Sequence, residues 1–202
     1  MSKRMVIIAC AGVAVALATG AYFAFLKPAH DCEPTGVIAG GAEIGGPFQL
    51  VTHKAVSVTE KDVIKGLTLV YFGYTFCPDI CPLDMARNIE AVDLLDEDGI
   101  DVTPVFITID PARDTPQVLS DYVDVMHPKM IGLTGTESQI LSAAKAYKTF
   151  YRKQGDGEDY LVDHMRFTYL MSPDGFLDFV RSELTAEELA TAVAEKAACY
   201  AK

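Results

Sequence analysis

The sequence predicts a mixed α/β sandwich behind an N-terminal transmembrane helix. The sandwich is predicted by two buried-strand patterns, at 67–74 and 102–109, which alternate with helical patterns and are followed by a hairpin and a last helix. The transmembrane helix is predicted by an uncharged apolar run at residues 5–26. With 202 residues, half of them hydrophobic, the chain is long enough for one domain with its own core and is not a disordered protein.

The charge balance excludes one broad class of function. The chain has 17 Lys and Arg against 28 Asp and Glu, which gives a formal net charge of −11. A phosphate backbone would repel so acidic a surface. We therefore expect no binding to nucleic acid.

As a helix, the apolar run at residues 5–26 would be about 33 Å long, enough to cross the hydrocarbon core of a bilayer. Lys3 and Arg4 precede it and favour a cytoplasmic N-terminus. We expect residues 1–26 to be a single-pass anchor in the inner (cytoplasmic) membrane, with the domain in the periplasm or, in a eukaryote, the mitochondrial intermembrane space. One alternative is a signal peptide cleaved near 16–18. Lipid attachment at Cys10 is disfavoured, because too few apolar residues precede it.

Residues 27–47 carry three Pro and five Gly and show little periodicity, so we expect a flexible tether there. A coil of this length reaches roughly 25 Å from the membrane. Residues 48–202 form the domain. Its expected strands are 48–51, 55–58, 67–74, 102–109, 168–172 and 176–180. Its expected helices are 60–65, 80–96, 114–126, 136–150 and 185 to the end.

Local signals justify these elements in order. The run at 67–74 is almost continuously apolar, β-branched or aromatic, as in a strand covered on both faces. Thr115 followed by Pro116 is a typical helix start, a capping side chain before a proline in the first turn. Residues 173–175 (PDG) predict the turn of the last hairpin. Thr185 with a Glu three residues later predicts a capping box at the start of the final helix.

Cys77 and Cys81 lie where the first buried strand ends and its helix begins, a common position for sites in α/β proteins. Thiols four residues apart on a helix have Cβ atoms about 5–6 Å apart, whereas a relaxed disulfide needs roughly 3.5–4.5 Å. The pair therefore suits a reducible disulfide or a shared metal ion. A purely structural disulfide is disfavoured, because so short a loop gains little stability from it.

His164 is the residue that separates a metal site from a redox pair. Two thiolates and one imidazole suit Cu(I), and Cu(II) with a further ligand. Zinc accepts the same donors, usually with a fourth. A lone histidine is more often a structural residue, so spacing alone leaves the choice open.

Several blocks of sequence, in order along the chain, resemble the Sco/SenC family. They are YFGYTFCPDICP at 71–82, FITIDPARDTP at 106–116, GLTG at 132–135, DH at 163–164 and YL at 169–170. The resemblance covers nearly all of residues 45–200. It implies a thioredoxin-like sandwich and a membrane-tethered, non-enzymatic copper chaperone, with Cys77, Cys81 and His164 matching the family's ligands for Cu(I) and Cu(II).

The same resemblance implies partners. They are the copper-bearing subunit of cytochrome c oxidase, whose dinuclear centre the family helps to assemble, and another copper chaperone or a thioredoxin-like reductant. Met165 departs from the small polar residue expected after the family's histidine. Phe167 occupies the place of the thioredoxin cis-proline, which favours metal binding over general disulfide exchange. The alternative function is a thiol–disulfide reductase that keeps an oxidase subunit's copper-site cysteines reduced, and only the copper chaperone requires His164.

The remaining candidates are weaker. Cys32 and Cys199 lie outside the motif and can pair with each other in an oxidising compartment, or stay free or pair between chains. Residues 110–116 are explained by loop closure and helix capping. Packing explains four methionines, and three histidines show no convincing set of ligands. These residues are Met85, Met126, Met130, Met171, His30, His53 and His127.

Overall fold

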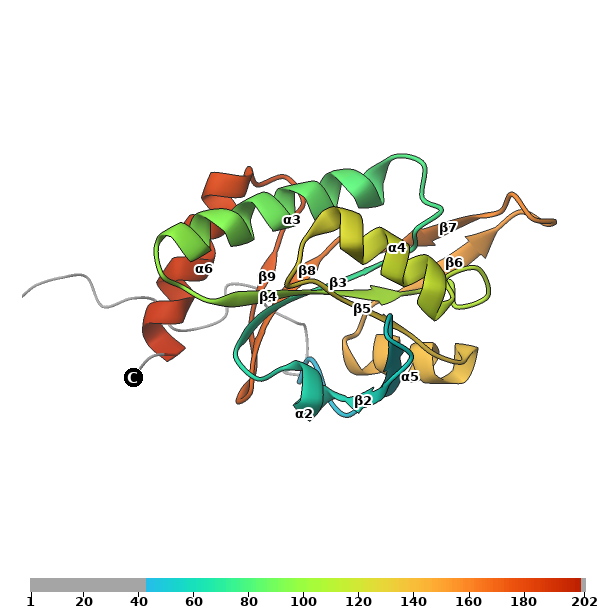
Figure 1. The fold of residues 1–202 in the computed structure, drawn as a ribbon, viewed down its shortest axis with the longest axis horizontal. Coiled ribbons are helices and arrows are strands. Elements are labelled where there is room, and N and C mark those ends of the chain that lie inside the picture. Colours follow the sequence, from blue (N-terminus) through green and yellow to red (C-terminus); the bar gives the residue numbers. More distant parts are fainter. Residues whose placement is uncertain (1–42, 201–202) are drawn as a thin grey trace, which may run out of the picture. The chain divides into compact units, whose positions relative to one another are not determined.

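The computed structural model describes residues 43–200, in which one seven-stranded mixed sheet lies between two layers of helices (Figure 1). The strand order is β2-β1-β5-β4-β3-β8-β9, and the β3, β4 and β5 neighbours are parallel while the other pairs are antiparallel. The strands are β1 (Gln49–Thr52), β2 (Ser57–Thr59), β3 (Leu67–Gly73), β4 (Val102–Thr108), β5 (Ile131–Thr134), β8 (Thr168–Ser172) and β9 (Gly175–Val180). The predicted α/β sandwich is confirmed.

Within residues 43–200, the helices that cover the sheet are α2 (Glu60–Val63), α3 (Ile80–Glu97), α4 (Pro116–Met126), α5 (Glu137–Ala146) and α6 (Ala186–Tyr200). Helices α3, α4 and α6 lie on one face, and α2 and α5 lie on the other (Figure 1). All seven residues of β3 are buried, as expected for a strand covered on both sides. At the predicted start of α4, Thr115 accepts a hydrogen bond from the Val118 N–H, with Pro116 in the first turn.

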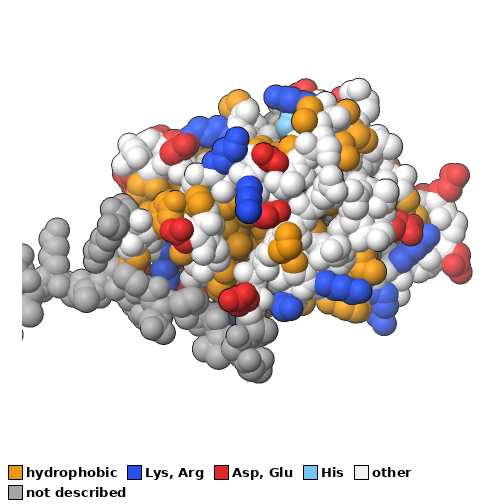
Figure 2. Space-filling view, turned by 90° about the horizontal axis from the view of Figure 1, so that it is seen from below, with side chains coloured by type: hydrophobic (Ala, Val, Ile, Leu, Met, Phe, Trp, Pro, Cys, Tyr) orange, Lys and Arg blue, Asp and Glu red, His pale blue; other side chains and the backbone are white. Residues whose placement is uncertain are grey.

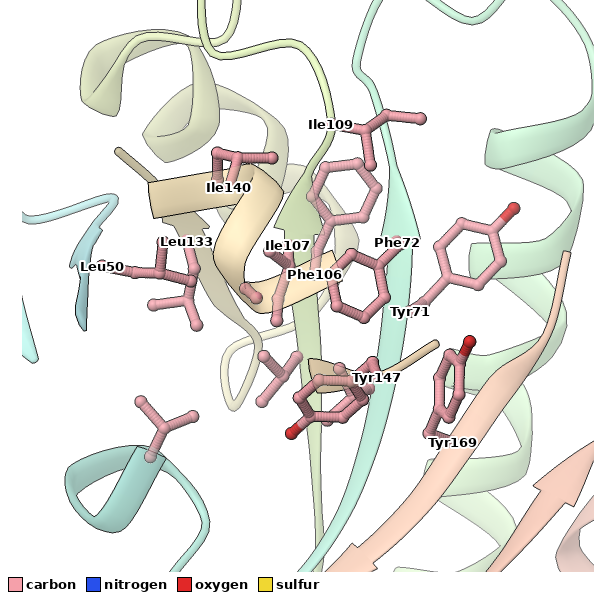
Figure 3. Close-up of a cluster of buried hydrophobic side chains, with 14 of the residues drawn as sticks. Leu50, Tyr71, Phe72, Phe106, Ile107, Ile109, Leu133, Ile140, Tyr147 and Tyr169 are labelled. Atoms are coloured by element: carbon pink, nitrogen blue, oxygen red, sulfur yellow. The ribbon is translucent and has the colours of Figure 1, made fainter. Parts of the chain in front are cut away.

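Aromatic side chains fill the core on the two sides of β3 (Figure 3). On the α5 side, the Phe72 ring packs against Tyr147 and Tyr169, with centroids 5.3 and 5.9 Å away. On the other side, Tyr71 and Phe106 lie beneath α3 and α4. The alternation of side chains along β3 thus divides the core, and Tyr71 is on the side that faces the thiols.

The structure corrects one helix of the prediction. The helix expected at 136–150 ends at Ala146. Lys148 takes a left-handed backbone conformation (φ 54°), and the Thr149 N–H donates to the Ala144 carbonyl. This is the usual way to satisfy the last carbonyls of a helix, but the left-handed residue is commonly glycine. Nothing in the local sequence therefore marked the end.

Three strands were not expected from the sequence, namely β5 and the separate hairpin of β6 (Tyr151–Gln154) and β7 (Leu161–His164). β5 is only four residues long and contains Gly132. β6 is polar and largely exposed. Neither β5 nor β6 therefore has the apolar pattern by which strands are recognised in a sequence. The hairpin matters for function, because His164 is its last residue.

The N-terminal predictions fall on residues 1–42, which lie outside the described residues, so the anchor and most of the tether stay predictions. Among residues 43–200, no helix is long and apolar enough to cross a bilayer.

Cys199 is disulfide-bonded. Its expected partner, Cys32, lies outside the described residues, and that pairing stays a prediction.

On the face that carries α2 and α5, basic and acidic side chains lie interspersed (Figure 2).

Candidate metal centre

The two cysteines lie at the carboxyl end of β3, as the sequence predicts. Cys77 is half-buried in the loop after the strand, and Cys81, only 1% exposed, is the second residue of α3. Both are thiols rather than a disulfide. The Cys77 Sγ accepts a hydrogen bond from the Cys81 N–H at 3.4 Å. The Cys77 sulfur therefore interacts with the amino end of α3, where backbone N–H groups favour negative charge.

His164 joins this pair from a distant part of the chain. Its Nε2 lies 3.2 Å from the Cys81 Sγ, and its Nδ1 lies 3.0 Å from the Met165 carbonyl oxygen. Because a carbonyl only accepts, Nδ1 carries the hydrogen and Nε2 presents a lone pair toward the Cys81 sulfur. The imidazole thus has the tautomer that a metal ligand at Nε2 requires. The Met165 contact is made by its backbone carbonyl, so it does not depend on which side chain stands at that position.

Two tyrosines hold the imidazole from its sides. The rings of Tyr71 and Tyr74 meet the His164 ring edge-on, with centroids 6.0 and 6.2 Å away and interplanar angles of 86°. Such edge-to-face contacts are the favoured arrangement of aromatic rings. They restrict rotation of the imidazole and keep Nε2 directed at Cys81.

A buried carboxylate that the sequence did not single out ties the histidine segment to the cysteine helix. Asp84, three residues after Cys81 on α3, accepts hydrogen bonds from the Arg166 side chain at 2.9 and 3.0 Å and from the Tyr71 hydroxyl at 2.9 Å. A two-point Arg–carboxylate contact fixes orientation as well as distance. Arg166 is two residues after His164, so this ion pair holds the His164 backbone beside α3. The only sequence signal was an acidic residue one helical turn beyond Cys81.

The two thiols differ in acidity. Burial raises the pKa of Cys77, but hydrogen bonds from the backbone N–H groups of Cys81, Asp79 and Ile80 outweigh it, and the net pKa is lowered. Burial raises the pKa of Cys81 to about 12. Burial also lowers the pKa of His164, so its imidazole is neutral near neutral pH. Cys77 is the thiolate former of the pair, and Cys81 is a thiol that donates to His164.

This asymmetry predicts selective alkylation. In the reduced protein near neutral pH, iodoacetamide is expected to modify Cys77 at least about 100-fold faster than Cys81, since only the thiolate reacts and Cys81 is also buried. Peptide mass spectrometry over a time course measures both rates. Raising the pH toward about 12 should narrow the difference, and equal rates near neutral pH would contradict the assignment.

The three site residues predicted from the sequence therefore lie near one another, but their side chains do not have the arrangement of a metal-binding site. Among residues 43–200, no three His, Cys, Asp or Glu side chains are already arranged to hold an ion. Cys81 and His164 are in contact, whereas the Cys77 sulfur is engaged with the amino end of α3. The donors, two sulfurs and one imidazole nitrogen, fit a soft metal ion.

Among residues 43–200, the other candidate methionines and histidines lie elsewhere, and His30 falls outside the described residues. Met85 lies on the buried face of α3 and belongs to the core. His53 accepts a hydrogen bond from the Gly132 N–H, and His127 contacts Asp93. Phe167 directly precedes β8, and residues 43–200 contain no cis peptide bond.

Taken together, a mixed sheet flanked by helices, two thiols at a strand–helix junction and a facing histidine define a thioredoxin-like protein with a thiol–imidazole site. Comparison with known proteins then assigns the family: the SCO1/SenC family profile matches residues 37–198. The chain belongs to the SCO1/SenC family.

Individual relatives agree with this assignment. The chain is 48% identical to Protein SenC of Rhodobacter capsulatus over 198 residues, which cover 95% of this chain and 89% of the relative. It is 41% identical to the human mitochondrial SCO1 homolog over 164 residues, 79% of this chain, and spans only about half (54%) of that longer protein.

Solved structures share the fold. Arabidopsis thaliana ScoI with copper bound is 42% identical, with a TM-score of 0.75, over 78% of this chain and 99% of that one. BsSco, described as having a disulfide switch and as a member of a family of cytochrome c oxidase assembly proteins, is 25% identical, with a TM-score of 0.63, over 80% of this chain and 98% of that one.

Proposed function

We propose that this protein binds copper through Cys77, Cys81 and His164 and delivers it to the dinuclear copper centre of cytochrome c oxidase. The observation that carries the proposal is the 3.2 Å approach of the His164 Nε2 to the Cys81 Sγ, across 83 residues of sequence. A site that served only thiol exchange would not need an imidazole lone pair aimed at the second sulfur. The copper-bound Arabidopsis relative supports the choice of metal.

The chemistry of the donors supports both copper states. Two thiolates bind Cu(I) because both partners are soft, and the neutral imidazole adds a third ligand that Cu(II) also accepts. The hydrogen bond from Nδ1–H to the Met165 carbonyl orients the imidazole and makes Nε2 a better donor. Delivery to another protein is favoured by the position of Cys77, which is half-buried and accessible at the edge of the site.

This assignment predicts that copper uptake depends on the redox state of the pair. The reduced protein is expected to bind one copper ion per chain, whereas the Cys77–Cys81 disulfide form binds none until dithiothreitol has reduced it. Metal analysis after desalting measures the stoichiometry, and a free-thiol assay on the same samples follows reduction. Unchanged copper stoichiometry in the oxidised protein would rule out both sulfurs as ligands.

A second candidate function is thiol–disulfide exchange, favoured by the unequal thiols. In that reaction the Cys77 thiolate attacks a partner disulfide and forms a mixed disulfide, releasing one partner thiolate. Cys81 then gives its proton to the released partner thiolate, and its sulfur attacks the Cys77 sulfur, which breaks the mixed disulfide, frees the second partner thiolate and leaves the Cys77–Cys81 disulfide. The partner gains two electrons and this protein loses two. The disulfide switch described for BsSco supports this candidate.

The partners and location belong to the same proposal. The acceptor is the copper-bearing subunit of the oxidase, and the supplier is another copper chaperone, with a thioredoxin-like reductant keeping the thiols reduced. The N-terminal apolar run anchors the protein in the inner membrane, with the domain on the extracytoplasmic side.

The anchor has its own test. The full-length protein is expected to stay in the membrane fraction after a carbonate wash, because a helix of this length is held by the hydrocarbon core rather than by charge. Protease added from the extracytoplasmic side should digest the domain. Recovery of a shortened, soluble mature form would show instead that the run is a cleaved signal peptide.

A further inference from the structure

The loop at residues 110–114, which the sequence explained by helix capping alone, contacts both segments that carry the site. We call the residues 74–79 the cysteine loop and β6 to β7 the histidine hairpin. We infer that the 110–114 loop is a brace that fixes the cysteine loop and the histidine hairpin relative to each other. The inference rests on the proposed metal site and names the residues that position it.

Asp114 holds the cysteine loop. Its carboxylate is fully buried and accepts hydrogen bonds from the Thr75 N–H at 3.0 Å and from the hydroxyls of Thr75 and Thr108, both at 2.5 Å. Thr75 is two residues before Cys77. Hydrogen bonds to a buried carboxylate are strong, and leaving it without donors is costly. The position of the cysteine loop is therefore tied to the end of β4.

Asp110 and Arg113 hold the histidine hairpin. The Tyr160 hydroxyl, just before β7, donates to Asp110, and Arg113 donates to Asp110 and to the Glu158 carbonyl, the latter at 3.2 Å. The Arg113 guanidinium also lies 3.7 Å from the centroid of the Tyr160 ring. Charge, stacking and hydrogen bonding thus converge on one face of the hairpin.

The brace is stiff between these two attachments. The Asp114 N–H donates to the Asp110 carbonyl at 2.9 Å, which closes the loop into a single turn. The Thr134 hydroxyl donates to the Asp114 carbonyl at 2.8 Å, so the turn is also fixed to β5. We therefore expect a displacement at one attachment to be passed to the other through this hydrogen-bonded turn.

The test uses two isosteric variants, each on one side of the brace and neither at a ligand. Tyr160→Phe removes the hydroxyl to Asp110 but keeps the ring beneath Arg113. Thr75→Val removes the hydroxyl to Asp114 but keeps the backbone bond. Tyr200→Phe and Thr191→Val are the matched controls, since both make the same chemical change on α6, away from the site.

Two readouts need no metal. In the full-length chain, Tyr160→Phe is expected to change the equilibrium constant of the Cys77–Cys81 disulfide with dithiothreitol by about threefold or more, although it touches neither cysteine. Thr75→Val is expected to shift the imidazole NMR signals of His164. In each readout, the effect of the Tyr160→Phe/Thr75→Val double variant should be smaller than the sum of the effects of the two single variants.

The controls should leave both readouts unchanged. The brace would be overturned if each variant affected only the segment in which it lies and if the effects of the single variants added up in the double variant. Because both readouts are metal-free, a protein that shows the cross-effects but fails to bind copper would refute the proposed function and leave the brace standing.

Discussion

Replacing His164 with Ala is expected to abolish stable Cu(II) binding and oxidase copper-centre assembly while only weakening Cu(I) binding. The variant loses the sole nitrogen donor, and two thiolates alone still suit the soft Cu(I) ion but tend to reduce Cu(II). We expect Cu(II) affinity to fall by at least about 100-fold, because even residues that merely orient a ligand are worth about 10–100-fold.

Absorption spectroscopy measures the loss directly. The thiolate-to-Cu(II) charge-transfer band should disappear in His164→Ala, while Cu(I) titration against a competing chelator should show weakened but measurable binding. Reduction of a model disulfide by Cys77 and Cys81 should stay broadly intact. His53→Ala is the matched control, since His53 contacts the Gly132 backbone rather than a thiol.

This experiment also separates the two candidate functions. A His164→Ala protein that loads both copper states normally and supports oxidase assembly, but fails in thiol–disulfide exchange, would make the reductase the better assignment. One variant separates the two functions, because the imidazole is essential to copper binding but not to thiol–disulfide exchange.

Replacing Gly73 with Ala is expected to damage both the core and the site. A Cβ at this last residue of β3 would lie 2.8 Å from the Tyr71 ring, 2.9 Å from the Phe106 ring and 3.2 Å from the Cys81 Sγ. Both rings are fully buried, so they can move only by displacing the close-packed side chains around them. Overpacking of this kind costs about 1–3 kcal/mol. For a domain of this size, that lowers the melting temperature by roughly 3–10 °C.

Copper binding is also expected to weaken, because two of the residues that the new Cβ would displace belong to the site or support it. Tyr71 contacts Asp84 and packs against His164, and Cys81 contacts His164. Calorimetry measures the stability, and copper titration of the folded variant measures the site. Gly66→Ala is the control, since a Cβ there meets nothing within 4 Å. A Gly73→Ala protein that melts and binds copper like the unmodified protein would show that the core yields where we expect it to resist.

The sequence by itself determined the features that depend on neighbouring residues. The apolar run of β3, the cap and proline at α4, and the four-residue spacing of Cys77 and Cys81 are all local patterns, and the structure confirms the elements they predicted. Donor chemistry made His164 a candidate third ligand, and the blocks that resemble the Sco/SenC family matched it to the family's ligand set.

Only the tertiary structure decided how these residues meet. His164 reaches Cys81 across 83 residues through a polar hairpin that has no apolar periodicity of its own and is held instead by Arg113 and Tyr160. The different acidities of two cysteines in one motif arise from burial and from backbone N–H groups, which composition does not encode. Contacts between distant segments depend on how the whole chain packs, whereas a sequence pattern reports only the few residues around it.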